Sequence, residues 1–162
     1  VKIGNRGRLL PAPKPVPAEK YMVTRTGTTY LSDLYYIWKA GNIPAYDTAF
    51  GGDPIIVEGK GLKRGLGVQG KSSVMFKLGG KANRFKAIVT VDKRSKTGGS
   101  GRFRVYSGDF FSNKVLWDSG TLTADSVAKE IDVDVKNVDC LMLVFEGEQM
   151  FGNWGEARVE KE

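Results

Sequence analysis

Few residues of this chain could take part in catalysis. Its 162 residues include no histidine and a single cysteine, Cys140, which lies in the most apolar run of the sequence. These residue types cannot assemble a histidine-based triad or a zinc site. The carboxylates are scattered, and no motif pairs two of them across a cleft as glycoside hydrolysis requires. The glycine-rich stretch 64–70 precedes a strand pattern instead of a helix, so it does not predict a phosphate loop. We expect a protein that is not an enzyme.

Three aspartates are candidates for binding a metal ion. Asp33, Asp47 and Asp53 lie in loop-rich sequence near the start of the predicted domain. Calcium takes about six to eight oxygen ligands, commonly from carboxylates and backbone carbonyls. The spacing of these three is not diagnostic, and solvated loop carboxylates are the alternative. We expect no required cofactor and keep a structural calcium ion at these aspartates as a hypothesis.

The net charge of +7 is distributed unevenly. Residues 1–29 carry six basic groups and one acid, and residues 60–104 carry 13 basic groups with Asp92 as the only acid. Residues 105–162 reverse this balance, with 12 acids and five bases. We favour an interpretation in which these blocks lie on complementary strands and neutralise each other. The alternative is a basic surface for an anionic polymer. No nucleic acid is expected, because the few aromatic residues of the basic block fall on predicted core faces.

The elements that position any site are predicted to be β-strands. Apolar and polar residues alternate over 72–78 and again over 85–91, which is typical of half-buried strands. Further strands are predicted at 21–25, 55–57, 61–62, 103–106, 115–117, 128–135, 140–145 and 154–159. A short helical turn is predicted between Thr29 and Trp38, and a glycine-rich turn over 64–70. No apolar run approaches the roughly 20 residues that cross a bilayer, so no membrane partner is expected. The fold class is all-β, a two-sheet antiparallel β-sandwich.

The N-terminal residues 1–20 are predicted to be a proline-rich linker or tail, ahead of a domain over 21–162. Prolines alternate with other residues from Pro11 to Pro17, which holds the backbone extended and removes hydrogen-bond donors. A spacer that joins the domain to a neighbour is the favoured interpretation. A proline-motif ligand is the alternative.

Several short motifs carry a family resemblance through their order along the chain. They are Tyr30–Leu34, Gly51–Ile55, Lys63–Val68, Phe76–Gly80, Phe85–Ala87, Trp117–Thr123, Ile131–Val135 and Asn153–Ala157. Together they cover about residues 28–160 and resemble the NPCBM domain, also classed as carbohydrate-binding module family 51. The resemblance implies a galactose-binding-like jelly roll, often attached to a glycosidase, that binds terminal galactose-type sugars. It also implies an extracellular, periplasmic or cell-surface location and allows for the structural calcium.

The resemblance implies a sugar site built from three segments that meet at one end of the sandwich. A sugar needs an aromatic platform and a few polar groups in fixed directions. The expected platforms are Tyr35, Tyr36, Trp38, Trp154 and Phe151, and the expected polar groups are Gln69, Asn153, Glu156, Asn42 and Asp33. Gln69 stands where the family commonly has a histidine, and Gly152 and Asn153 stand where it usually has a histidine and an aspartate. For each tryptophan, a place in the core is the alternative.

Three functions follow from these observations. The first is a non-catalytic carbohydrate-binding module that targets a linked enzyme or surface protein to glycans. The second is a protein-interaction or scaffolding sandwich without a sugar site, which the missing histidines motivate. The third is an anionic-polysaccharide binder that uses the basic block 60–104.

Overall fold

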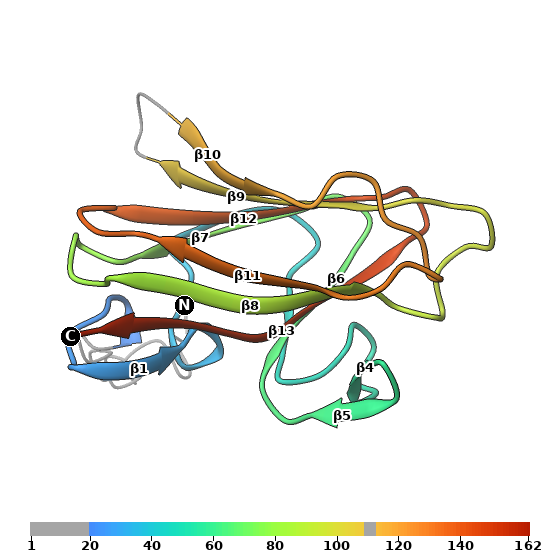
Figure 1. The fold of residues 1–162 in the computed structure, drawn as a ribbon, viewed down its shortest axis with the longest axis horizontal. Helices are drawn as coiled ribbons and strands as arrows, with labels where there is room; N and C mark the ends of the chain where they lie inside the picture. The colour runs from blue at the N-terminus through green and yellow to red at the C-terminus, as the bar shows by residue number, and fades with distance from the viewer. Residues whose placement is uncertain (1–19, 109–112) are drawn as a thin grey trace, which may run out of the picture.

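The computed structural model describes residues 20–108 and 113–162, which form two antiparallel β-sheets packed face to face (Figure 1). The strands are β1 (Gly27–Tyr30), β2 (Trp38–Gly41), β3 (Ala45–Tyr46), β4 (Ile55–Val57), β5 (Lys60–Leu62), β6 (Gly65–Gln69), β7 (Ser72–Lys77), β8 (Arg84–Val91), β9 (Arg102–Gly108), β10 (Asn113–Asp118), β11 (Lys129–Asp134), β12 (Cys140–Glu146) and β13 (Phe151–Lys161). One main sheet has the order β11-β8-β13-β6-β3, with β1 also paired to β13, and the other has the order β10-β9-β12-β7-β2. Strands β4 and β5 form a separate two-stranded sheet. The predicted all-β sandwich is confirmed.

The core lies between the two sheets and follows from the period-two pattern. In β8, Phe85, Ala87, Val89 and Val91 are buried while the residues between them are partly exposed. Strand β7 alternates in the same way. These faces meet around an aromatic cluster in which the ring of Phe103 lies 4.7 Å from that of Phe145. Burial of alternating apolar side chains is therefore what holds the sheets together.

Of two elements predicted near the N-terminus, one is absent and the other is present as a short turn. Residues 21–25 do not form a strand, since only Met22 makes an isolated bridge, to Lys77, and the first strand begins at Gly27. The predicted helical turn is present as a 3₁₀ turn, η3 (Leu31–Asp33). No side chain caps this turn.

The predicted glycine-rich turn over 64–70 is wrong in its main part, because Gly65–Gln69 form strand β6, which lies between β13 and β3. The reason lies in a segment distant in sequence. A Cβ at Gly67 would lie 2.3 Å from the backbone nitrogen of Phe50 and 2.5 Å from the carbonyl oxygen of Thr48. Glycine is needed here so that the backbone of residues 48–50 can pack directly on the strand.

The blocks of opposite charge lie on neighbouring strands, as favoured from the sequence. Lys77 of β7 pairs with Asp139 at 2.8 Å, and Arg84 of β8 pairs with Asp132 of β11 at 2.9 Å. Arg102 of β9 pairs with Asp118 of β10 at 2.6 Å. Much of the basic block is thus neutralised on the surface of the sheets.

The predicted linker and the membrane prediction are compared with the structure next. Apart from Lys20, the predicted linker 1–20 lies outside the described residues. Within the described ranges, no helix is long and apolar enough to cross a membrane.

Candidate functional site

Three loops gather at the end of the sandwich drawn on the right in Figure 1. They follow β6, β8 and β12, and backbone hydrogen bonds join them. The amide of Gly70 donates to the carbonyl of Met150 at 2.9 Å, and the amide of Lys96 donates to the carbonyl of Gln149 at 3.2 Å. Residues 69–71, 92–101 and 147–151 therefore form one connected surface, which we call the loop end and which also includes Phe50, whose ring lies beside that of Phe151.

The centre of the loop end is a cross-strand pair, Gln69 of β6 opposite Phe151 of β13. The Phe151 ring lies 6.2 Å from the ring of Phe50, and the guanidinium carbon of Arg94 lies 4.9 Å from its centroid. Both phenylalanines are partly exposed. The carboxamide of Gln69 makes no hydrogen bond to any residue that the structure describes, so it is free to donate and accept.

Arg94 is fixed in place by two carboxylates. Its Nε donates to Asp92 Oδ1 at 3.0 Å, and its Nη1 lies 3.5 Å from Asp53 Oδ2. Burial alone raises the pKa of the Asp92 carboxyl, but hydrogen bonds from Arg94 and Asn153 outweigh this effect and leave the pKa below its usual value. Asp92 therefore remains ionised near neutral pH and holds the guanidinium against the Phe151 ring.

Asn153 and Trp154, both expected to contact sugar, are buried instead. Trp154 is 1% exposed and packs edge-to-face on Phe103 at 5.0 Å. It cannot serve as a stacking platform, so that prediction is wrong and the core alternative holds. Asn153 is fully buried and donates from Nδ2 to Asp92 Oδ2 at 3.2 Å. Its contribution to the loop end is to position Asp92.

The remaining expected platforms lie on two other surfaces. Tyr35 and Tyr36 line a groove between the segments 34–37 and 43–46, and Tyr35 is 49% exposed. Trp38 is 47% exposed on β2, opposite Met75 of β7. The structure does not bring these three side chains together with Gln69.

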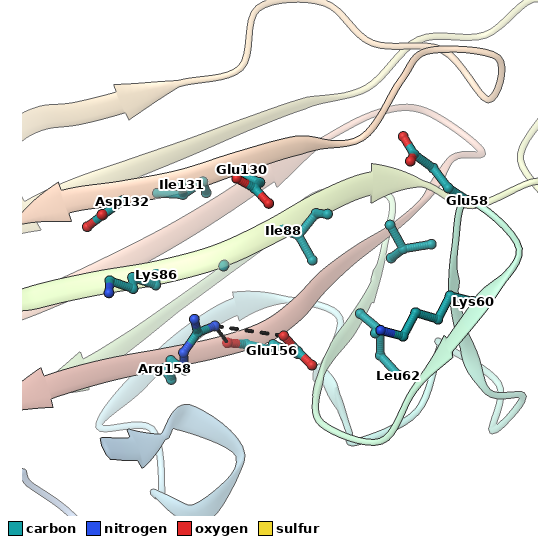
Figure 2. Close-up of a pocket in the computed structure, with 12 residues that line it drawn as sticks. Glu58, Lys60, Leu62, Lys86, Ile88, Glu130, Ile131, Asp132, Glu156 and Arg158 are labelled. Carbon is teal, nitrogen blue, oxygen red and sulfur yellow. Dashed lines mark hydrogen bonds and ion pairs between the residues drawn. The ribbon is translucent and has the colours of Figure 1, made fainter. Parts of the chain in front are cut away.

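Glu156 lines a separate cleft of about 470 Å³ on the outer face of the sheet (Figure 2). Its φ of 52° lies in the left-handed region, at the irregularity that shifts the register of β13 between Gly155 and Arg158. Arg158 donates to the Glu156 carbonyl at 3.0 Å. Figure 2 shows this pair on β13, with Leu62 of β5 to the right of Glu156 and Ile88 of β8 above it in the view. Glu156 is five residues along β13 from Phe151, about 17 Å in an extended strand.

The three candidate calcium ligands are not brought together. Asp33 and Asp47 flank Arg64, whose guanidinium nitrogens lie 2.6 Å from one carboxylate and 3.1 Å from the other. Asp53 belongs instead to the Arg94 cluster. Over residues 20–108 and 113–162, no group of three or more histidine, cysteine or acidic residues could hold a metal ion. The guanidinium already supplies the positive charge between Asp33 and Asp47, and a calcium ion at these aspartates stays a prediction.

No clear sequence signal marks Arg94 or Phe50 as parts of the loop end. Arg94 lies in a loop of charged and small residues, and Phe50 precedes a glycine pair, so neither stands in a periodic pattern. Two structural contacts, the stacking of Arg94 on Phe151 and the packing of residues 48–50 on Gly67, identify them.

Comparison with known proteins agrees with this architecture. A family model described as NPCBM/NEW2 domain matches residues 27–160. None of the curated proteins matches the chain. Among solved structures, the CBM51 of Clostridium perfringens GH95 in complex with methyl-galactose is 24% identical with a TM-score of 0.71, and the match covers 82% of this chain and 99% of that one.

Two further structures contain similar modules within larger chains. The CBM51-2 and INT domains of C. perfringens ZmpB, with GlcNAc, are 21% identical with a TM-score of 0.72, and the match covers 83% of this chain and 31% of that one. The tandem CBM51 modules of Sp3GH98, a family 98 glycoside hydrolase from Streptococcus pneumoniae SP3-BS71, are 18% identical with a TM-score of 0.70, covering 95% and 52%. At these identities the similarity establishes the shared fold.

Proposed function

Because the chain belongs to the NPCBM/NEW2 domain family, we propose that it is a non-catalytic module that binds a glycan at the loop end of the sandwich. The observation that carries this proposal is the Gln69–Phe151 pair, in which an unpartnered carboxamide stands beside a partly exposed aromatic ring. Such a pair combines the two features that a sugar site needs, an apolar face and a directional polar group.

Each residue of the loop end has a separate role in this proposal. The rings of Phe50 and Phe151 offer apolar surface to the C–H face of a sugar. Gln69 donates and accepts hydrogen bonds with vicinal hydroxyls, as an imidazole at this place would. Arg94 donates from a guanidinium that Asp92 holds in a fixed orientation. The buried Asn153 does not contact the sugar itself and contributes by donating a hydrogen bond that holds Asp92 in place.

Terminal galactose and GlcNAc are the first sugars to test. One similar module was solved with methyl-galactose and another with GlcNAc. Both ligands are neutral, and the two modules are 24% and 21% identical to this chain over the matched residues. We propose a galactose-type or N-acetylhexosamine end group and expect specificity to depend on the carboxamide of Gln69.

Binding at the loop end is favoured over ionic binding by the basic block. Lys77, Arg84 and Arg102 of that block each pair with an aspartate. Lys86 likewise lies 3.1 Å from Glu160. A surface whose cations are already paired attracts a polyanion weakly. We place the module outside the cell, next to a glycosidase or surface protein whose local concentration at the glycan it raises.

Calorimetric titration with methyl galactosides and GlcNAc tests the proposal. Gln69→Ala should weaken binding about fivefold, from the loss of about one hydrogen bond. Phe151→Leu keeps apolar volume but removes the flat ring face and should weaken binding by a similar factor. Gln69→Glu keeps the acceptor and loses the donor. Lys136→Ala, at the opposite end of the sandwich, is the matched control and should leave affinity unchanged.

The same titrations separate the alternatives. Neutral-sugar binding should change little between low and high salt, whereas ionic binding to a polysaccharide falls steeply. If no glycan binds at millimolar concentration, sugar binding is refuted and a scaffolding role takes its place. If sugars bind but Gln69→Ala and Phe151→Leu retain full affinity as folded proteins, the site is not at the loop end.

A further inference from the structure

A groove of about 570 Å³ is lined mainly by tyrosines and by none of the loop-end residues. Its lining residues are Tyr21, Tyr35, Tyr36, Ile43, Pro44 and Tyr46. Tyr21 and Tyr35 meet edge-to-face with ring centroids 5.4 Å apart, and they are 40% and 49% exposed. None of the lining residues is charged. We call this surface the tyrosine groove.

The tyrosine groove is held in place by the sandwich beneath it. The hydroxyl of Tyr46, on strand β3, donates to the carbonyl of Leu34 at 3.0 Å. The backbone amide of Tyr35 donates to the carbonyl of Lys20, where the described chain begins. The groove is therefore preformed, and the chain leading to residues 1–19 departs at its rim.

We propose that the tyrosine groove binds the proline-rich segment Pro11–Pro17 of the same chain. Grooves lined by tyrosines and other aromatic residues are the surfaces that recognise extended proline-rich segments. Proline rings present apolar faces without a backbone donor, and the exposed carbonyls of such a segment accept hydrogen bonds from tyrosine hydroxyls. An uncharged groove suits the run PAPKPVP, in which Lys14 is the only charged residue.

The length of the connection permits this docking. Residues 18–20 separate Pro17 from the rim of the groove, and three extended residues span about 10 Å. Seven residues in polyproline II conformation span about 22 Å. Covalent attachment over such a short distance gives an effective concentration of the order of millimolar, so even a weak contact is populated.

The same lining fits a proline-rich segment better than a sugar. Sugar hydroxyls need several polar partners in fixed directions. The side chains that line the groove offer only tyrosine hydroxyls, and that of Tyr46 is already bound to Leu34. Tyr35 and Tyr36, expected from the sequence to be sugar platforms, are therefore assigned to the segment instead.

Peptide titration followed by NMR tests this proposal on the full chain. The receptor carries Pro13→Gly, Pro15→Gly and Pro17→Gly, which disable the attached segment and lie outside the sandwich. A synthetic peptide of residues 9–20 is added, and the same peptide with the three glycines is the control. We expect saturable shifts of the groove tyrosines with the native peptide alone. The unsubstituted chain should bind it at least about threefold more weakly, because its own segment competes.

A pair of exposed-residue variants localises the effect. Tyr35→Ala in the receptor should weaken peptide binding about fivefold. Ile56→Ala, equally exposed at 48% on the β4–β5 hairpin, should not change it. The proposal is overturned if the native and glycine peptides act alike, if shifts fall outside the groove, or if Tyr35→Ala binds the peptide normally. Shifts of the groove tyrosines by methyl galactoside at sugar-binding concentrations would also overturn it, in favour of a sugar surface.

Discussion

Substitution of Gly67 by alanine tests the most consequential difference between sequence and structure, the buried strand in place of a glycine-rich turn. The new Cβ would stand 2.3 Å from the nitrogen of Phe50 and 2.5 Å from two further backbone atoms of residues 48–49. Non-bonded heavy atoms prefer about 3.5–4.0 Å, so this backbone must move by more than 1 Å or the strand must shift. Forced overpacking of this kind costs about 3 kcal/mol.

The matched control is Gly61→Ala on strand β5. Its Cβ would meet only the Ile56 side chain, at an ordinary 3.8 Å. Gly61→Ala should therefore stay within about 0.5 kcal/mol of the parent, as surface substitutions usually do. In a domain of this size, 3 kcal/mol corresponds to a melting temperature lower by about 10 °C.

Urea denaturation at 25 °C and thermal melting measure both variants, and sugar titration below the melting temperature measures function. Because displacement of Phe50 also disturbs the loop end, Gly67→Ala should lose affinity as well as stability. If Gly67→Ala is as stable as Gly61→Ala, residues 48–50 do not press on β6, and the account of this strand is refuted.

Two further predictions concern buried aromatic residues. Trp154→Ala should destabilise the fold by about 4 kcal/mol, as expected for a core tryptophan, and the protein that remains folded should bind sugar normally. Urea denaturation measures the stability, and sugar titration measures the affinity. A variant that is as stable as the parent but has lost affinity would contradict this prediction. Burial, the largest cause, raises the pKa of the Tyr46 hydroxyl from 10.0 to about 12. Because the pKa is raised in the folded state, the stability it contributes is complete below pH 10 and is lost as the pH rises towards 12. Absorbance titration should show one late-titrating tyrosine that Tyr46→Phe removes, and an unchanged titration curve in that variant would contradict the assignment.

The fold places the predicted binding residues on different surfaces, and strand pairing, burial and a register shift explain why. Gln69 and Phe151 are adjacent because two antiparallel strands pair in one register. Trp154, three residues beyond Phe151, is 1% exposed because the core covers it. Glu156, two residues further, returns to the surface at the irregularity in β13. Spacing along the chain does not reveal where a strand is covered or where its register shifts, so it could not separate these residues.

The charge blocks show what could be anticipated without coordinates. Opposite blocks of similar size in one chain are expected to meet, since unpaired like charges on neighbouring strands repel. The structure confirms this with pairs such as Arg84–Asp132. The identity of each partner depended on strand order, which places β8 beside β11 although about 40 residues separate them in sequence.

The all-β class, most strand positions and the mutual neutralisation of the charges follow from the sequence alone, because alternation and turn chemistry are local properties. The tertiary structure decided which glycine stretch became a strand, which tryptophan entered the core and which arginine stood over Phe151. These outcomes depend on contacts between residues far apart in sequence, such as Gly67 with Phe50 and Arg94 with Phe151. Glycine tolerates both turn and strand, and tryptophan is used both in cores and on surfaces, so only the packing around each residue selects between them.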